Sequence, residues 1–325
     1  MVAVACLLMP PIVISSTARA SETREVGAGA IAELLREGRE LLQAGDAAAA
    51  VGVLERAVEV APESADGHAL LGRALALDDR YLAAEEALRK AIALGRQDLA
   101  TWFYLGSTLW ENGRLGDAEE AFRTALERGG RAPLLVYQLG RLLLWQGRGA
   151  EAVTLLREAS ETTPGAPDVL LDLARALESA GDLQAAREAY GRAVELAPED
   201  SHARYGLAAV LGRLGESEAA ARERAVYRRL YEEEQERVRQ EGLTEARVAR
   251  GQELVRTGRA REAIVHLRAL PETATSLAAL AEAYLAAGDA TAALHTLERA
   301  VVLAPERDDL RARLNEARLR LHENP

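Results

Sequence analysis

Apolar residues along most of this chain recur every three or four positions, the spacing of an amphipathic helix, and the pattern itself returns at a fixed interval. Pro164 and Pro198 lie 34 residues apart, and Pro62 lies three such intervals before Pro164. Each interval holds two apolar helical segments separated by a turn, so it predicts a helical hairpin. The units start at Ile31, Ala65, Leu99, Pro133, Pro167 and Ser201, and two more start near Thr244 and Ala274.

Small residues mark four positions of these units. Position 15 is Gly in every unit except the second, which has Asp79, and this predicts a left-handed turn residue after the first helix. Positions 8 and 20 are Gly or Ala in all eight units, so we expect them to face each other where the two helices approach closely. Position 27 is Ala in six of the eight units and is expected to admit the next hairpin. The sequence therefore predicts an all-α array, because one hairpin cannot bury its own apolar faces.

The third unit carries the most specific set of residues. They are Trp102, Leu105, Gly106, Ala118, Phe122 and Ala125. With these residues the unit resembles the tetratricopeptide repeat, and the resemblance extends from Ile31 to about Pro305. It implies a right-handed α-solenoid of about eight helix-turn-helix units, whose first helices line a concave groove. It implies a fold and a binding habit rather than a reaction.

An irregular joint interrupts the array after six units, which occupy residues 31–228. A polar helical stretch runs from Glu216 to Gln240 without a sustained apolar heptad, and we expect Gly242 to end it. We interpret residues 229–243 as an extended connecting helix that leads to units seven and eight at residues 244–307. A dedicated dimerisation helix is the alternative.

The C-terminal residues 308–325 are interpreted as a capping helix and tail. Leu310, Leu314, Ala317 and Leu321 share one face of this segment. Such a face suits a helix that covers the open end of a solenoid.

The N-terminal residues 1–20 have the pattern of an export signal. An apolar core is followed by Ala18-Arg19-Ala20, a small-x-small sequence that places cleavage before Ser21, and residues 21–30 would be a linker. No basic residue precedes the core, and Pro10-Pro11 interrupt it, so an uncleaved membrane anchor is the alternative. We expect an extracytoplasmic location, periplasmic or secreted.

Composition and motifs narrow the classes of function. The chain has 40 basic and 51 acidic residues, a formal charge of −11, which disfavours nucleic acid as the partner. The single cysteine, Cys6, lies in the predicted signal, so a mature chain lacks thiol chemistry. The five histidines are dispersed, and no HExxH, P-loop or GxSxG motif occurs. We therefore expect no enzyme activity, no cofactor and no metal. The paired acids Glu85-Glu86 and Glu119-Glu120 are interpreted as solvated.

The candidate binding residues lie between the third and fifth units. By the resemblance, positions 5, 9, 12 and 13 of each first helix face the groove and position 4 faces the core, so Trp102 is expected to be structural. The expected ligand-binding residues are Phe103, Trp110, Tyr137, Arg141, Leu144, Trp145 and Arg175. Aromatic rings on a helix face that does not contribute to the hydrophobic core are typical of a binding hot spot. The alternative is that these rings pack against neighbouring helices.

Position 9 also forms a row of arginines, which are Arg39, Arg73, Arg141 and Arg175, with Ser107 in between. Guanidinium groups in a row could pair with the carboxylates of an extended ligand. Acids of the chain itself, such as Asp66 or Asp168, could neutralise them instead. The carboxylate clamp of chaperone-binding relatives is excluded, because its lysine and asparagine positions hold other residues here. These are Phe103, Tyr137 and Leu171, and Ser107, Arg141 and Arg175.

The sequence thus favours an exported, non-enzymatic adaptor that binds a protein or peptide in the groove of units two to five. Two other classes stay open. One is a structural module that self-associates into a homo-oligomer through the array or the joint helix. The other is a regulatory or recruiting partner of an envelope enzyme, of the glycan or cytochrome maturation type, which rests on family analogy alone.

Overall fold

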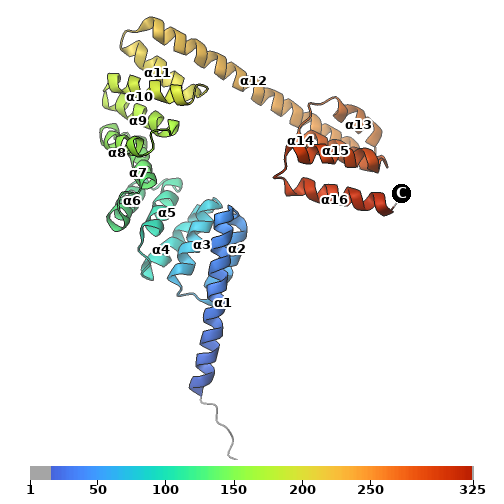
Figure 1. The fold of residues 1–325 in the computed structure, drawn as a ribbon, viewed down its shortest axis with the longest axis horizontal. Coiled ribbons are helices and arrows are strands. Elements are labelled where there is room, and N and C mark those ends of the chain that lie inside the picture. The colour runs from blue at the N-terminus through green and yellow to red at the C-terminus, as the bar shows by residue number, and fades with distance from the viewer. Residues whose placement is uncertain (1–15, 324–325) are drawn as a thin grey trace, which may run out of the picture. The chain divides into compact units, whose positions relative to one another are not determined.

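The computed structural model describes residues 16–323, with side chains from 29 to 319, and this part consists of α-helices joined by short turns (Figure 1). The predicted all-α class is confirmed. The chain divides into two compact units, one ending at Arg224 and one beginning at Ala225. Cys6 and most of the predicted signal lie outside the described residues.

The first compact unit holds six helical hairpins. Its helices are α1 (Ser16–Ala44), α2 (Ala47–Val60), α3 (Ala65–Leu77), α4 (Tyr81–Ala93), α5 (Leu99–Glu111), α6 (Leu115–Gly129), α7 (Pro133–Trp145), α8 (Gly149–Thr162), α9 (Pro167–Ala180), α10 (Leu183–Leu196), α11 (Ser201–Arg213) and the start of α12 (Ser217–Arg256). The second holds the rest of α12 with α13 (Ala260–Arg268), α14 (Ala274–Ala286), α15 (Ala290–Leu303) and α16 (Asp308–Glu323).

The 34-residue interval coincides with the hairpins. The helices α3, α5, α7, α9, α11 and α14 begin at the residues where the sequence places the unit starts. All eight residues at position 15 have a positive φ, from 58° at Asp79 to 87° at Gly181. Asp79 is the one non-glycine among them, and Asp tolerates this left-handed conformation better than most residues. The turn chemistry was therefore predicted correctly.

Packing within a hairpin differs from the expectation at position 8. The side chain that faces position 8 is the large residue at position 24, whereas we expected the small residue at position 20. A Cβ added to Gly106 would lie 2.6 Å from the Phe122 ring, and one added to Gly72 would lie 2.5 Å from the Leu88 side chain. Position 8 is small because a large side chain lies across it. The alanines at position 20 are fully buried in all eight units, so they permit the close approach of the helices.

Two segments are helical where the sequence analysis expected an interruption. Residues 21–30, expected to be a linker, belong to α1. Helix α12 continues through Gly242 to Arg256, so the expected break is absent and the first helix of unit seven is the end of α12. A single glycine costs a helix interior only about 1 kcal/mol relative to alanine. Ion pairs along the exposed middle of α12 offset part of that cost, for example from Arg237 to Glu234 and Glu241 at 2.6 and 2.7 Å.

The C-terminal helix covers the last hairpin as predicted. Leu310 and Ala317 of α16 are fully buried, and Leu314 is nearly so. They pack with residues of α14 and α15, among them Leu277 and Leu297. The apolar end of the solenoid is thereby closed.

Successive first helices contact each other in the first compact unit: α1 with α3, α3 with α5, α7 with α9, and α9 with α11. The second helices show no contact of similar extent among themselves in the described residues. The side on which helices lie closer together is the inside of a curved array. We call the side formed by α1, α3, α5, α7, α9 and α11 the inner face.

Two acidic side chains expected to be solvated join successive hairpins instead. Glu85 and Glu119, both at position 21, are only 13% and 16% exposed. Each pairs with the arginine at position 16 of the next unit: Glu85 with Arg114, and Glu119 with Arg148 at 2.6 Å. Burial raises the pKa of Glu119, but the hydrogen bonds from Arg123 and Arg148 outweigh it and hold the pKa below its usual value. The interpretation of these two acids as solvated was wrong.

Candidate functional site

Three of the predicted binding residues form one cluster on the inner face. The guanidinium carbon of Arg141 lies 5.3 Å from the ring centre of Trp110, on the preceding unit, and 5.4 Å from that of Tyr137. Both distances are within the range of a cation–π interaction. Arg141 also donates to the Oε1 of Gln138 at 3.0 Å. The arginine is therefore stacked on two rings and held by its neighbours.

Asp172 of α9 holds this cluster together, and the sequence analysis missed it. Its carboxylate accepts the Tyr137 hydroxyl at 2.9 Å and pairs with the Arg141 Nε at 3.3 Å and the Arg175 Nη1 at 3.3 Å. The Asp172 side chain is only 13% exposed. Burial, together with the charge of Asp172 and its hydrogen bond, raises the pKa of Tyr137, and Arg141 offsets part of this rise. The signal in the sequence was an acid three residues before Arg175 on the same helix.

Phe103, a predicted binding ring, and Trp102, predicted to be structural, both pack against the core. Phe103 is half-buried, and its ring lies 6.0 Å from that of Phe122, which is fully buried. Trp102 is also half-buried and packs against the same core cluster. Its indole Nε1 is buried without a hydrogen-bond partner. Trp110 and Tyr137 pack against this core cluster too, so the alternative that these rings contact neighbouring helices holds in part for all three of these predicted rings.

Trp145, at the end of α7, is the most exposed of the three tryptophans. Its side chain is 72% exposed, whereas Leu144 beside it is half-buried against the core cluster. Tryptophan is enriched at protein interfaces, where its large ring can be covered by a partner. Trp145 is the one predicted binding ring that the fold leaves mostly exposed.

The first two arginines of the row, Arg39 and Arg73, lie in the first three hairpins, away from the Arg141 cluster. Arg39 and Arg73 line a cavity of about 250 Å³ together with residues of α3, α5 and the preceding loop. Arg96 also lines it, but its guanidinium pairs with both Asp66 and Asp98. Asp66 therefore neutralises Arg96 rather than a position 9 arginine. No ion pair among the described residues includes Arg39 or Arg73.

Asp98, the other acid of this cavity, is also bound by groups other than Arg39 and Arg73. It accepts hydrogen bonds from the backbone N–H of Thr101 at 2.9 Å and from the Thr101 hydroxyl at 2.8 Å, and so caps α5. Burial raises the pKa of Asp98, but these bonds and Arg96 outweigh it and hold the pKa below its usual value. Both acids of the cavity are thus satisfied by other groups.

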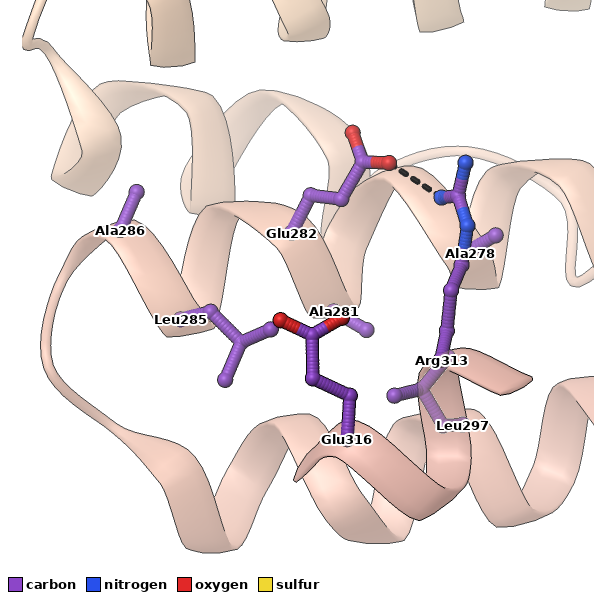
Figure 2. A pocket seen from close by; sticks show the side chains of 8 residues that line it. All are labelled: Ala278, Ala281, Glu282, Leu285, Ala286, Leu297, Arg313 and Glu316. Carbon is purple, nitrogen blue, oxygen red and sulfur yellow. Dashed lines mark hydrogen bonds and ion pairs between the residues drawn. The ribbon is translucent and has the colours of Figure 1, made fainter. Parts of the chain in front are cut away.

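The second compact unit holds a hollow of about 390 Å³ between α14 and the capping helix. Figure 2 shows Arg313 of α16 paired with Glu282 of α14, beside a floor that includes Ala281, and Glu316 reaching toward Leu285. The small alanines of α14 create this space. Its charged groups include one base and two acids, so the hollow lacks the cationic excess of the Arg39 cavity.

The described residues contain no group of three His, Cys, Asp or Glu side chains that could hold a metal ion. No helix among them is sufficiently long and apolar to span a bilayer. The inner face presents guanidinium groups stacked on aromatic rings, and both residue types are enriched at protein interfaces.

Comparison with known proteins agrees with the repeat pattern. Residues 35–98, 103–167 and 167–210 match models of the tetratricopeptide repeat. The solved structure of pilF from Pseudomonas aeruginosa is similar, with a TM-score of 0.53 and 22% identity, over 63% of this chain and 93% of that one. A tetratricopeptide repeat protein from Parabacteroides merdae aligns over 89% of this chain and 99% of that one, with a TM-score of 0.48 and 14% identity. YrrB, described as a TPR protein with an unusual peptide-binding site, aligns over 52% and 88%, with a TM-score of 0.47 and 19% identity. No curated protein gives a significant match.

Proposed function

The chain belongs to the tetratricopeptide repeat family, and we propose that it is a non-catalytic scaffold that binds a polypeptide segment on the inner face of units two to five. Proteins of this family generally act as protein-interaction scaffolds, and the curved array of such a solenoid offers an extended concave surface. An extended peptide can lie along this surface and contact several units in turn.

Trp145 is the observation that carries the proposal. An indole at the end of α7 that is 72% exposed has no structural role that burial would explain, and by the family resemblance its repeat position faces the groove. The proposed surface also includes Leu144, Trp110, Tyr137 and Phe103, with Arg141 and Arg175 as polar contacts. Rings of this kind supply large contact area at low entropic cost when a ligand covers them.

A selection from a library of displayed random dodecapeptides tests this function, with the full chain as the bait. We expect enriched peptides, and we expect the Trp145→Ala variant to bind a synthetic copy at least about tenfold more weakly in fluorescence anisotropy. The matched control is Leu82→Ala on the second helix α4, where the side chain is 79% exposed. Equal affinity of the two variants, or no enriched peptide, would contradict the proposal.

We further propose that the protein acts outside the cytoplasm after cleavage of residues 1–20. The apolar core and the small-x-small sequence before Ser21 support this. Sequencing of the protein isolated from its own host should begin at Ser21, and an intact Met1 on soluble cytoplasmic protein would contradict it.

Self-association is a second candidate, favoured by the exposed middle of α12. Tyr231, Val238 and Leu243 are each about half exposed there. Light scattering coupled to size-exclusion chromatography at micromolar concentration decides this candidate. A monomer at every concentration would eliminate it.

A further inference from the structure

The two ends of the arginine row differ in the residue that the next hairpin carries at position 6. Arg141 meets Asp172, which stands at this position of the next unit. At the same position, the units after Arg39 and Arg73 carry Leu70 and Tyr104. The next unit therefore places an acid beside Arg141 but an uncharged residue at the same position after Arg39 and Arg73.

The surroundings of Arg73 agree with this difference. Its guanidinium carbon lies 5.3 Å from the ring centre of Tyr104, and its Nε is buried without a hydrogen-bond partner. A buried polar group without a partner costs free energy until a ligand or water satisfies it. The aromatic ring fixes the guanidinium in place, so that its remaining N–H groups stay available.

The charge of the cavity is set by these contacts. Arg39, Arg73 and Arg96 line it against two acids, Asp66 and Asp98, and both acids pair with Arg96. The lining groups therefore sum to one net positive charge within a space of about 250 Å³, and Arg39 and Arg73 form no ion pair of their own among the described residues. The chain as a whole carries −11, so this cavity is cationic against the average of the molecule.

We propose that this cavity binds a carboxylate group of the peptide that lies on the inner face, with Arg39 and Arg73 as its ligands. Guanidinium groups donate in a planar fork that matches a carboxylate, and the pairing is strongest where water is partly excluded. The inference rests on the proposed function and adds to it a recognition element: an acidic group at one fixed place in the bound segment. The carboxylate belongs either to a side chain or to the C-terminus of that segment.

The same peptide selection tests this inference, with peptides displayed so that their C-termini are free. We expect the enriched peptides to share an Asp, a Glu or the terminal carboxylate at one fixed position. For a synthetic peptide, replacing that group by its amide should weaken binding to the wild-type chain about tenfold. Separate amidation of the side chain and of the C-terminus identifies which carboxylate is bound.

Two variants locate the acid preference in the cavity. Arg73→Gln removes one guanidinium, and Tyr104→Asp keeps both arginines but gives Arg73 the internal partner that Arg141 already has. Both should bind the acidic peptide and its amide with equal affinity. Arg56→Gln, on the second helix α2 and without an ion pair among the described residues, is the matched control and should retain the tenfold difference. Circular dichroism confirms that each variant is folded.

The outcomes separate the two proposals. Peptides that are enriched without a shared carboxylate overturn this inference and leave the proposed function standing. An acid preference that persists in folded Arg73→Gln assigns the carboxylate to other residues and also overturns it. A failure to enrich any peptide contradicts the proposed function, and this inference with it.

Discussion

Both ends of the inner face carry arginines at repeat position 9, but in the part of the chain that the structure describes the arginines of only one end form an ion pair with an acid. Between α7 and α9, Asp172 holds Tyr137, Arg141 and Arg175 in one network. Between α1 and α5, Arg39 and Arg73 have no carboxylate partner among the described residues.

A single residue in the neighbouring unit thus decides whether an arginine at position 9 has an ion pair within the array. Both ends keep the same backbone, so this difference alters which groups are available without altering the fold. Under our proposals, Arg39 and Arg73 bind the carboxylate of the ligand because no acid of the described residues pairs with them, whereas Asp172 partly satisfies Arg141 and Arg175.

The two tryptophans at the extremes of burial should show this division most strongly. Trp102→Ala removes a ring packed against the core between helices, and we expect a loss of about 3 kcal/mol in the free energy of unfolding. Trp145→Ala removes an exposed ring and should cost less than about 0.5 kcal/mol. Urea denaturation of both variants measures the difference. Equal losses would mean that Trp145 belongs to the core and that the exposed binding surface does not exist.

Removal of the shared carboxylate should have the next largest effect. Asp172→Ala leaves the Tyr137 hydroxyl and two guanidinium groups without their acceptor, and we expect a loss of about 2 kcal/mol. Asp168→Ala on the same helix is the control, because its carboxylate is exposed in the first turn and forms no ion pair among the described residues. It should cost no more than about 0.5 kcal/mol. A loss for Asp172→Ala as small as that of the control would show that the network contributes no stability.

High pH should weaken the same end of the inner face. The pKa of Tyr137 is raised in the folded chain by burial and by Asp172, so the unfolded phenol releases its proton first, above about pH 10. The contribution of Tyr137 to stability is complete below that pH and is lost as pH rises beyond it. Tyr137→Phe should therefore lose about 1 kcal/mol less than the wild type between pH 9 and pH 12. Parallel pH profiles of the two proteins would refute the role of this hydrogen bond.

The smallest effect is expected for a variant that makes the Arg141 region resemble the Arg39 and Arg73 region. Asp172→Asn leaves Arg141 and Arg175 without a carboxylate, as Arg39 and Arg73 are in the wild type. We expect this variant to gain about threefold in affinity for a selected peptide to which two further glutamates have been added beside the Trp145 contact, measured at low salt. The gain should disappear in high salt, because exposed charge pairs are screened. A variant that gains nothing at low salt would show that Asp172 does not mask these arginines.

The sequence predicted what depends on one residue or one hairpin. The unit starts, the left-handed residues at position 15 and the capping helix follow from local backbone preferences and apolar spacing. Its failures concern interactions between units, which spacing within one unit does not reveal. The partner of position 8 proved to be position 24, and Glu85 and Glu119 proved to join successive hairpins.

The charge pattern of the sequence also indicates which positions of successive units are in contact. The pairing of positions 21 and 16 is Glu with Arg for Glu119 and Arg148, and it is reversed as Arg with Glu for Arg187 and Glu216. Such a reversal between two repeat positions indicates contact. Asp172 could have been found similarly, by comparing position 6 with position 9 of the preceding unit. The continuation of α12 through Gly242 could not, since a glycine without a following proline is a weak stop.

Hydrogen–deuterium exchange of the full chain, with and without a saturating selected peptide, tests the central claim most directly. Amides in groups that a ligand stabilises exchange more slowly, and so the pattern locates the bound segment. We predict added protection in the first helices α3, α5, α7 and α9 and little change in the second helices α4, α6 and α8. Protection confined to the second helices, or to residues after Arg224, would contradict binding on the inner face.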